Sequence, residues 1–205
     1  GEHNVANLLA AVGLAHAAGV PLDAAVRGAA AVATVPGRLE RVPVREDVHA
    51  FVDYSHTPGA LEHAVATLRP LCRGRLWVLF GCGGDRDRGK RPLMGRVAAT
   101  GDRVVLTSDN PRTEDPEAIL DENEAGLREA GLRRVELPAL GESAGAYARE
   151  VDRRAAIEWV VSQASAGDVL LVAGKGHEDY QIVGREKRHF DDREEVRRAA
   201  ARPRM

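Results

Sequence analysis

The chain has 205 residues, with 29 Lys and Arg against 31 Asp and Glu and a formal net charge of -2 at pH 7. This length suits one medium domain with an appendage, or two small domains. The near balance of charge argues against a general polyanion binder, so we expect neither nucleic-acid binding nor attraction to an acidic membrane. The composition is globular, and its longest apolar runs are too short for insertion into a bilayer.

Cys72 and Cys82 stand ten residues apart and fit neither a disulfide framework nor a zinc site. We therefore expect a cytoplasmic protein of a bacterial cell, the bacterial origin following from the resemblance given below. No leader pattern opens the sequence. Because the chain starts at Gly1 rather than Met, we expect it to be processed or excised from a longer protein.

The first part of the chain predicts a small helical pair. Apolar residues recur at helical spacing over residues 4–18, and a second helix over residues 22–33 follows the break at Gly19–Pro21. Pro36-Gly37 then punctuates the chain. We expect a domain boundary here, with residues 1–36 as a helical segment and residues 37–205 as a second domain.

After this boundary, apolar strands alternate with helices. This pattern predicts an α/β fold with a doubly wound, mostly parallel, Rossmann-like sheet. Thr57 and Asp115 each precede a proline and are expected to cap the helices that follow. A hairpin over residues 180–190 and a short basic helix over residues 192–198 complete the prediction. The expected strands are residues 48–54, 76–81, 103–108, 133–137 and 168–173, and the expected helices between them are residues 58–71, 91–100, 116–130 and 152–164.

Four strand ends carry unusual polar sequences. In an open α/β sheet the carboxyl ends of parallel strands meet at one edge, where ligands bind. The four segments should therefore lie together. They are Asp53 to Pro58, Gly81 to Asp87, Ser108 to Arg112, and Gly174 to Glu178.

Each segment also has a purely structural interpretation. The glycines of residues 81–84 suit close backbone approach to a ligand, and Arg86 suits carboxylate or phosphate, but a charged surface turn has the same composition. Asn110 and Arg112 suit a zwitterionic head group, or a solvent-exposed turn. Glu178 suits a ligand ammonium, whereas His177 reads as a surface residue.

Phosphate-loop and covalent chemistry find no support in the sequence. Residues 84–91 match G-x-x-x-x-G-K, but Arg91 stands where that motif needs a Ser or Thr hydroxyl. No G-x-G-x-x-G dinucleotide motif is present. No nucleophile and base can be paired, and Cys82 is expected to be a small buried filler.

Taken in order, these segments resemble the carboxyl-terminal part of the Mur ligases, and among them the members that add diaminopimelate. The resemblance covers nearly the whole chain. It implies a three-domain ATP- and Mg²⁺-dependent enzyme that adds meso-diaminopimelate to UDP-N-acetylmuramoyl-L-Ala-D-Glu in peptidoglycan synthesis. In that chemistry a substrate carboxylate becomes an acyl phosphate, which the incoming amine attacks.

The resemblance also implies roles for single residues, matched by motif position. No catalytic residue and no metal ligand is expected in this chain. Arg38, Asp53 and His56 match residues near the ATP in the closed form. The diaminopimelate contacts are matched by Arg86, Asp109, Asn110, Pro111, Arg112, Gly174 and Glu178.

The family's G-x-x-G-K-[ST] nucleotide loop is missing from this sequence. Residues 1–36 then correspond to the tail of the central ATP-binding domain, which would bind most of the ATP and Mg²⁺, and other missing domains would bind the nucleotide substrate. We expect the chain alone to be inactive. Two alternatives stay open, namely a noncatalytic amino-acid or anion-binding module and a related ligase that adds lysine or extends folate with glutamate.

Overall fold

A computed structural model describes residues 2–202. The chain divides into two compact units, one ending at Val35 and the other beginning at Pro36. The first contains α1 (Glu2–Ala17) and α2 (Leu22–Ala31). Every residue of α2 is at least partly exposed, and in α1 Leu9 and Leu14 keep 69% and 72% of their surface exposed. The apolar side chains of this pair are therefore not buried within it.

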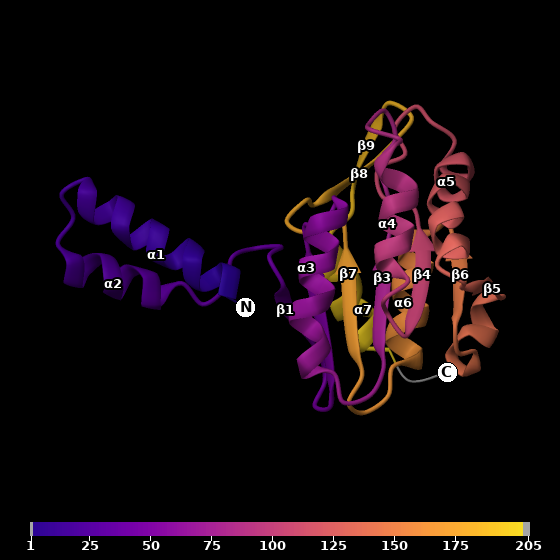
Figure 1. The fold of residues 1–205 in the computed structure, drawn as a ribbon, viewed down its shortest axis with the longest axis horizontal. Coiled ribbons are helices and arrows are strands. Elements are labelled where there is room, and N and C mark those ends of the chain that lie inside the picture. Colours follow the sequence, from indigo (N-terminus) through magenta and orange to yellow (C-terminus); the bar gives the residue numbers. More distant parts are fainter. Residues whose placement is uncertain (1, 203–205) are drawn as a thin grey trace. The chain divides into compact units, whose positions relative to one another are not determined.

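The second unit is a sheet with helices on both faces. Its order is β1-β2-β7-β3-β4-β6-β5, in which β1 is antiparallel to β2 and every other neighbouring pair is parallel. Figure 1 shows α3, α4 and α5 side by side on one face, while α6 and α7 cover the other. The expectation of a doubly wound, mostly parallel α/β sheet is confirmed.

The bounds of these elements follow the sequence patterns closely in most places. The strands are β1 (Glu40–Arg45), β2 (Val48–Asp53), β3 (Leu76–Phe80), β4 (Arg103–Thr107), β5 (Arg133–Arg134), β6 (Ala146–Glu150) and β7 (Val169–Ala173). The helices are α3 (Pro58–Leu68), α4 (Lys90–Ala98), α5 (Pro116–Glu129), α6 (Arg153–Gln163) and α7 (Asp192–Ala200). A separate hairpin consists of β8 (Tyr180–Val183) and β9 (Glu186–His189).

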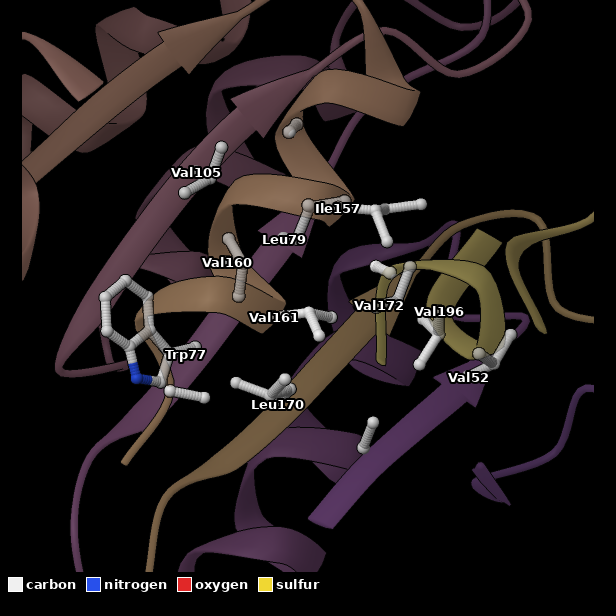
Figure 2. Close-up of a cluster of buried hydrophobic side chains, with 14 of the residues drawn as sticks. Val52, Trp77, Leu79, Val105, Ile157, Val160, Val161, Leu170, Val172 and Val196 are labelled. Atoms are coloured by element: carbon white, nitrogen blue, oxygen red, sulfur yellow. The ribbon is translucent and has the colours of Figure 1, made fainter. Parts of the chain in front are cut away.

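Both faces of the central strands are packed. In β3 all five residues are buried, with Trp77 and Leu79 in one apolar cluster and Leu76, Val78 and Phe80 in the other. Figure 2 shows the first cluster, in which α6 and α7 pack against the sheet. Burial on two faces explains why these strands read as continuous apolar runs.

Local signals set the starts of two helices. Thr57 Oγ1 accepts a hydrogen bond from Ala60 N at 3.3 Å, and Asp115 Oδ1 accepts one from Glu117 N at 3.0 Å. Both caps precede a proline in the first turn of the helix, as expected.

The predicted strand at residues 133–137 was largely wrong. Only Arg133 and Arg134 pair, and a 3-10 helix occupies Leu137–Glu142. The strand that extends this side of the sheet is β6, whose last two residues are only half-buried. The edge strand β1 was also missed, because Pro43 and the charged residues beside it resemble a loop.

Candidate functional site

The carboxyl ends of β2, β7, β3 and β4, four adjacent strands, carry the four polar segments. Because these strands are parallel neighbours, their exits share one edge of the sheet, as expected. The hairpin β8–β9 follows the exit of β7 and rises beyond this edge (Figure 1). The edge therefore combines residues separated by more than one hundred positions in the chain.

The segments after β4 and β7 form one buried polar network around Asn110. Its Oδ1 accepts hydrogen bonds from Ile182 N at 3.0 Å and from Lys175 Nζ at 3.2 Å, while its Nδ2 donates to Glu178 Oε2 at 2.9 Å. Two donors on one side of the amide fix its orientation. Asn110 therefore directs its own N–H group toward the Glu178 carboxylate.

Asp109 brings a second carboxylate to the same network. Its residue is 7% exposed, and its Oδ1 lies 3.6 Å from Lys175 Nζ but accepts no hydrogen bond from any residue in the described range 2–202. Gly174 faces the other oxygen and has a φ of +121°, a conformation that favours glycine. A buried carboxylate oxygen without a hydrogen-bond donor is uncommon in a folded protein and requires an explanation.

Hydrogen bonds from the hairpin hold the loop after β4. Arg112 N donates to Ile182 O at 3.0 Å, Gly184 N donates to Arg112 O at 2.6 Å, and Gln181 Nε2 donates to Asp109 O at 2.7 Å. These bonds stabilise Arg112 at a φ of +52°, which is rare for a residue other than glycine. The hairpin and this loop are thus held together by these three hydrogen bonds.

The arginines expected at the site have different surroundings. Arg112 is half-buried and its Nη1 donates to Gly84 O at 2.8 Å, so it connects the loops after β3 and β4. Arg86 is exposed and donates to the carbonyl of Asp85 at 2.9 Å. Pro111 is buried between these loops, and its carbonyl lies close to Gly84.

Arg91 anchors the glycine-rich loop after β3. It is fully buried, donates to Glu114 and Glu122, and donates to Gly83 O at 3.2 Å. Arg91 and the backbone N–H of Asp85 lower the pKa of Glu114 to about 2. This position is therefore a structural support, in agreement with the interpretation that residues 84–91 are not a phosphate loop.

Residues expected near a nucleotide gather at the exit of β2. The Arg38 guanidinium lies 5.1 Å from the centre of the Tyr54 ring, and the Tyr54 ring contacts the His56 ring at 4.5 Å. His56 Nδ1 interacts with Tyr54 O at 3.0 Å, which leaves its other ring nitrogen for a partner. Asp53 is different, since its two oxygens accept from Leu39 N at 2.7 Å and from the Ser55 hydroxyl.

Two supporting residues escaped the sequence interpretation. Arg153 is fully buried, forms an ion pair with Asp192 at 2.7 Å, and donates to Ala173 O and Ser108 O at the ends of β7 and β4. Nothing in its sequence surroundings signals this role. Lys175 could have been found, because it stands between two glycines directly after a buried strand.

Cys82 is not a nucleophile. Burial raises the pKa of its thiol to about 12, and its Sγ lies 3.0 Å from Asn123 Oδ1. In the part of the chain that the structure covers, no group of three His, Cys, Asp or Glu side chains is arranged to hold a metal ion. The polar groups that this edge presents are therefore charged and amide side chains rather than a reactive thiol.

Comparison with known proteins identifies the family. Residues 37–176 match the family described as Mur ligase, glutamate ligase domain. The chain is 51% identical, over its whole length, to a UDP-N-acetylmuramoyl-L-alanyl-D-glutamate–2,6-diaminopimelate ligase of Gloeobacter violaceus, and 50% identical, over 96% of its length, to the enzyme of the same name of Geobacter metallireducens. It spans 39% of the length of each of these relatives.

Solved structures agree with this match. One, of a protein with the same name, is 43% identical with a TM-score of 0.69, and the similarity covers 96% of this chain and 38% of the other. A UDP-N-acetylmuramate-alanine ligase from Thermotoga maritima shares the fold at 19% identity with a TM-score of 0.61, covering 96% of this chain and 36% of the other. By the sequence match and by the fold, the chain belongs to the Mur ligase family.

Proposed function

We propose that this chain is the amino-acid-binding part of a cytoplasmic ligase that adds meso-diaminopimelate to UDP-N-acetylmuramoyl-L-Ala-D-Glu in peptidoglycan synthesis. Relatives bearing the name of that enzyme match the chain at about half of its positions. The main support from the structure is Asp109 at the carboxyl edge of the sheet. This residue is buried, and its Oδ1 accepts no hydrogen bond from the described residues. An anionic oxygen without a donor suits a ligand ammonium group.

The site offers both carboxylates and guanidinium groups, which supports a ligand that carries both ammonium and carboxylate groups. Asp109 and Glu178 together offer negative charge to a ligand ammonium group. Arg86 and Arg112 offer guanidinium groups to ligand carboxylates. Asn110 donates to Glu178, Gly174 lies beside Asp109, and Pro111 is buried in the loop after β4. Diaminopimelate carries two ammonium and two carboxylate groups, whereas lysine lacks the second carboxylate.

ATP and Mg²⁺ are proposed as cofactors of the full-length protein. The residues at the exit of β2 fit a nucleotide in part, because exposed Arg38 can approach phosphate and His56 has a ring nitrogen available. Asp53, with both oxygens already bonded, would act by holding the backbone next to Arg38. Bound ATP supplies the phosphoryl group that activates the substrate carboxylate.

We assign residues 1–36 to the end of the central ATP-binding domain and residues 37–205 to the carboxyl-terminal domain. The exposed apolar side chains of α1 and α2 support this assignment, since they need a larger domain to cover them. The G-x-x-G-K-[ST] loop of the family is not in this sequence. The 205-residue chain alone is therefore expected to form no amide bond.

The test is amino-acid-dependent phosphate release by the full-length protein, supplied with the UDP-linked dipeptide, ATP and Mg²⁺. We expect release with meso-diaminopimelate and a kcat/KM at least about 100-fold lower with lysine, because an unpaired Arg in the site disfavours the shorter ligand. Arg112→Ala should remove most of this preference. Arg96→Ala, a control for an exposed arginine paired with Glu129, should leave it intact.

Other results would assign a different function. Equal rates with both amino acids, or a preference that Arg112→Ala leaves unchanged, would contradict diaminopimelate recognition and favour a lysine-adding or other ligase of the family. Absence of phosphate release with every amino acid tested would favour a noncatalytic binding module.

A further inference from the structure

Lys175 lies at the centre of the polar network, but it is not among the residues proposed to contact the amino acid. Its side chain is fully buried. Its Nζ lies 3.2 Å from Asn110 Oδ1 and 3.6 Å from one oxygen each of Asp109 and Glu178. A buried ammonium group is costly unless it is paired, so these oxygens balance its charge.

The charges around Lys175 do not cancel. One ammonium group faces two carboxylates, which leaves a single negative charge among these three side chains. Of the two carboxylates, Asp109 is held more weakly, because its Oδ1 pairs with Lys175 only at 3.6 Å and accepts no hydrogen bond within the part of the chain described. This group therefore matches one ligand ammonium rather than two.

Resting on the function proposed above, we propose that Lys175 is a positioning residue that sets the preference for an electrically neutral diamino dicarboxylic acid over a cationic diamino acid. Its ammonium group neutralises one carboxylate and holds Asn110 so that the amide N–H reaches Glu178. Without this positive charge, the site gains one uncompensated negative charge. Lysine, with a net charge of +1, then binds better relative to diaminopimelate, whose net charge is zero.

A merely structural role predicts a different pattern. If Lys175 only filled space or linked the loops, its loss would weaken both amino acids by the same factor. If Lys175 sets the charge of the site, its loss lowers kcat/KM for diaminopimelate more than kcat/KM for lysine. The ratio of kcat/KM for diaminopimelate to kcat/KM for lysine therefore separates the two roles.

The experiment uses the full-length protein with meso-diaminopimelate and L-lysine as alternative amino acids. Lys175→Met removes the charge at similar length, and Lys175→Gln removes it while keeping a hydrogen-bond donor, which carries the test should the methionine variant fail to fold. Lys175→Arg keeps the charge. Lys187→Met is the matched control, because exposed Lys187 contacts the same Tyr180 ring as Lys175, at 3.8 Å against 5.5 Å.

We expect the ratio to fall at least about tenfold in both neutral variants, and to change less than about twofold in Lys175→Arg and Lys187→Met. The KM for ATP should stay unchanged in all four. An unchanged ratio in the neutral variants, or an equal fall in Lys175→Arg, would overturn the role assigned to Lys175. Failure of the proposed function is separate, because the unaltered protein would then show no preference for diaminopimelate.

Discussion

Asp168 and Asp109 are both buried aspartates at the ends of strands, but they lie at opposite edges of the same sheet. Asp168 precedes β7, where its Oδ1 accepts from Arg75 N at 2.7 Å and its Oδ2 accepts from Trp77 Nε1 at 2.9 Å and Ser165 N at 3.0 Å. Asp109 follows β4, where its Oδ1 accepts no hydrogen bond from residues 2–202. The first carboxylate has hydrogen-bond donors on both oxygens, whereas the second has an oxygen that is held, within the described chain, only by an ion pair with Lys175 at 3.6 Å.

This difference separates structural polar groups from recognition groups. Burial alone does not separate the two kinds of group, because Asp168 and Asp109 are both less than one-tenth exposed. The useful distinction is whether each polar atom has a hydrogen-bond partner within the protein. Substitutions of fully hydrogen-bonded groups should therefore lower the free energy of unfolding, whereas substitution of Asp109 should lower the affinity for the amino acid.

The largest effect on stability is expected at Arg153. This residue lies at the same edge as Asp109, but its guanidinium group has an ion pair and hydrogen bonds within the protein. Arg153→Met leaves fully buried Asp192 without its ion pair and frees the ends of β4 and β7. We expect a loss of about 3–5 kcal/mol in the free energy of unfolding, measured by urea denaturation. Arg154→Met, which breaks a half-exposed pair with Glu195, should cost less than about 1 kcal/mol. Equal costs would contradict this interpretation.

Asp168→Ala should have the next largest effect. It leaves the Trp77 indole N–H and two backbone N–H groups without an acceptor, at a cost of about 2–4 kcal/mol in unfolding free energy. The affinity of the folded full-length protein for meso-diaminopimelate, measured by calorimetry, should stay within about twofold. A large loss of affinity would show that the two edges are not independent.

Asp109→Asn should give the opposite result. The substitution removes no hydrogen bond to Asp109 Oδ1 but does remove its ion pair with buried Lys175 at 3.6 Å. Because Lys175 keeps Glu178 and Asn110 as partners, the free energy of unfolding should fall by only about 1–2 kcal/mol. The affinity for meso-diaminopimelate should fall by about 10- to 100-fold, since the ligand ammonium loses a charged acceptor. Destabilisation as large as that of Asp168→Ala, with unchanged affinity, would make Asp109 a structural residue.

The smallest effect concerns pH and the loop after β3. Hydrogen bonds from Arg91 and from Asp85 N lower the pKa of Glu114 from 4.5 to about 2. The resulting stabilisation is present above pH 4.5 and is lost as the pH falls toward 2, because the unfolded chain takes up the proton first. Denaturation curves at pH 6, 4 and 2.5 should show a steeper loss for the unaltered chain than for Glu114→Gln, whereas parallel losses would contradict the assignment.

Much of the fold was predictable from sequence because the central strands are buried on two faces. The apolar runs of β3 and β7 and the proline-marked starts of α3 and α5 carried that information. The region around β5 and β6 was not predictable in this way. There, the strand predicted at residues 133–137 pairs only at Arg133 and Arg134 and gives way to a 3-10 helix from Leu137. The strand β6 contains charged residues, Arg149 and Glu150, so it does not read as an apolar run.

The candidate site was predictable as a set of loops but not as a network. Parallel neighbouring strands bring Asp109, Asn110 and Glu178 to one edge, which the strand order implies. The sequence did not indicate that Gln181 supports the loop backbone or that Lys175 lies beneath it, because both depend on how the hairpin packs. It also did not indicate that both oxygens of Asp53 are used internally.

The most direct test of the central claim is calorimetric titration of the full-length protein with meso-diaminopimelate and with L-lysine, with the nucleotide substrate and a non-hydrolysable ATP analogue present. Recognition of both charged ends at the carboxyl edge of the sheet predicts that diaminopimelate binds at least about 100-fold more tightly. Equal affinity for the two amino acids would contradict it.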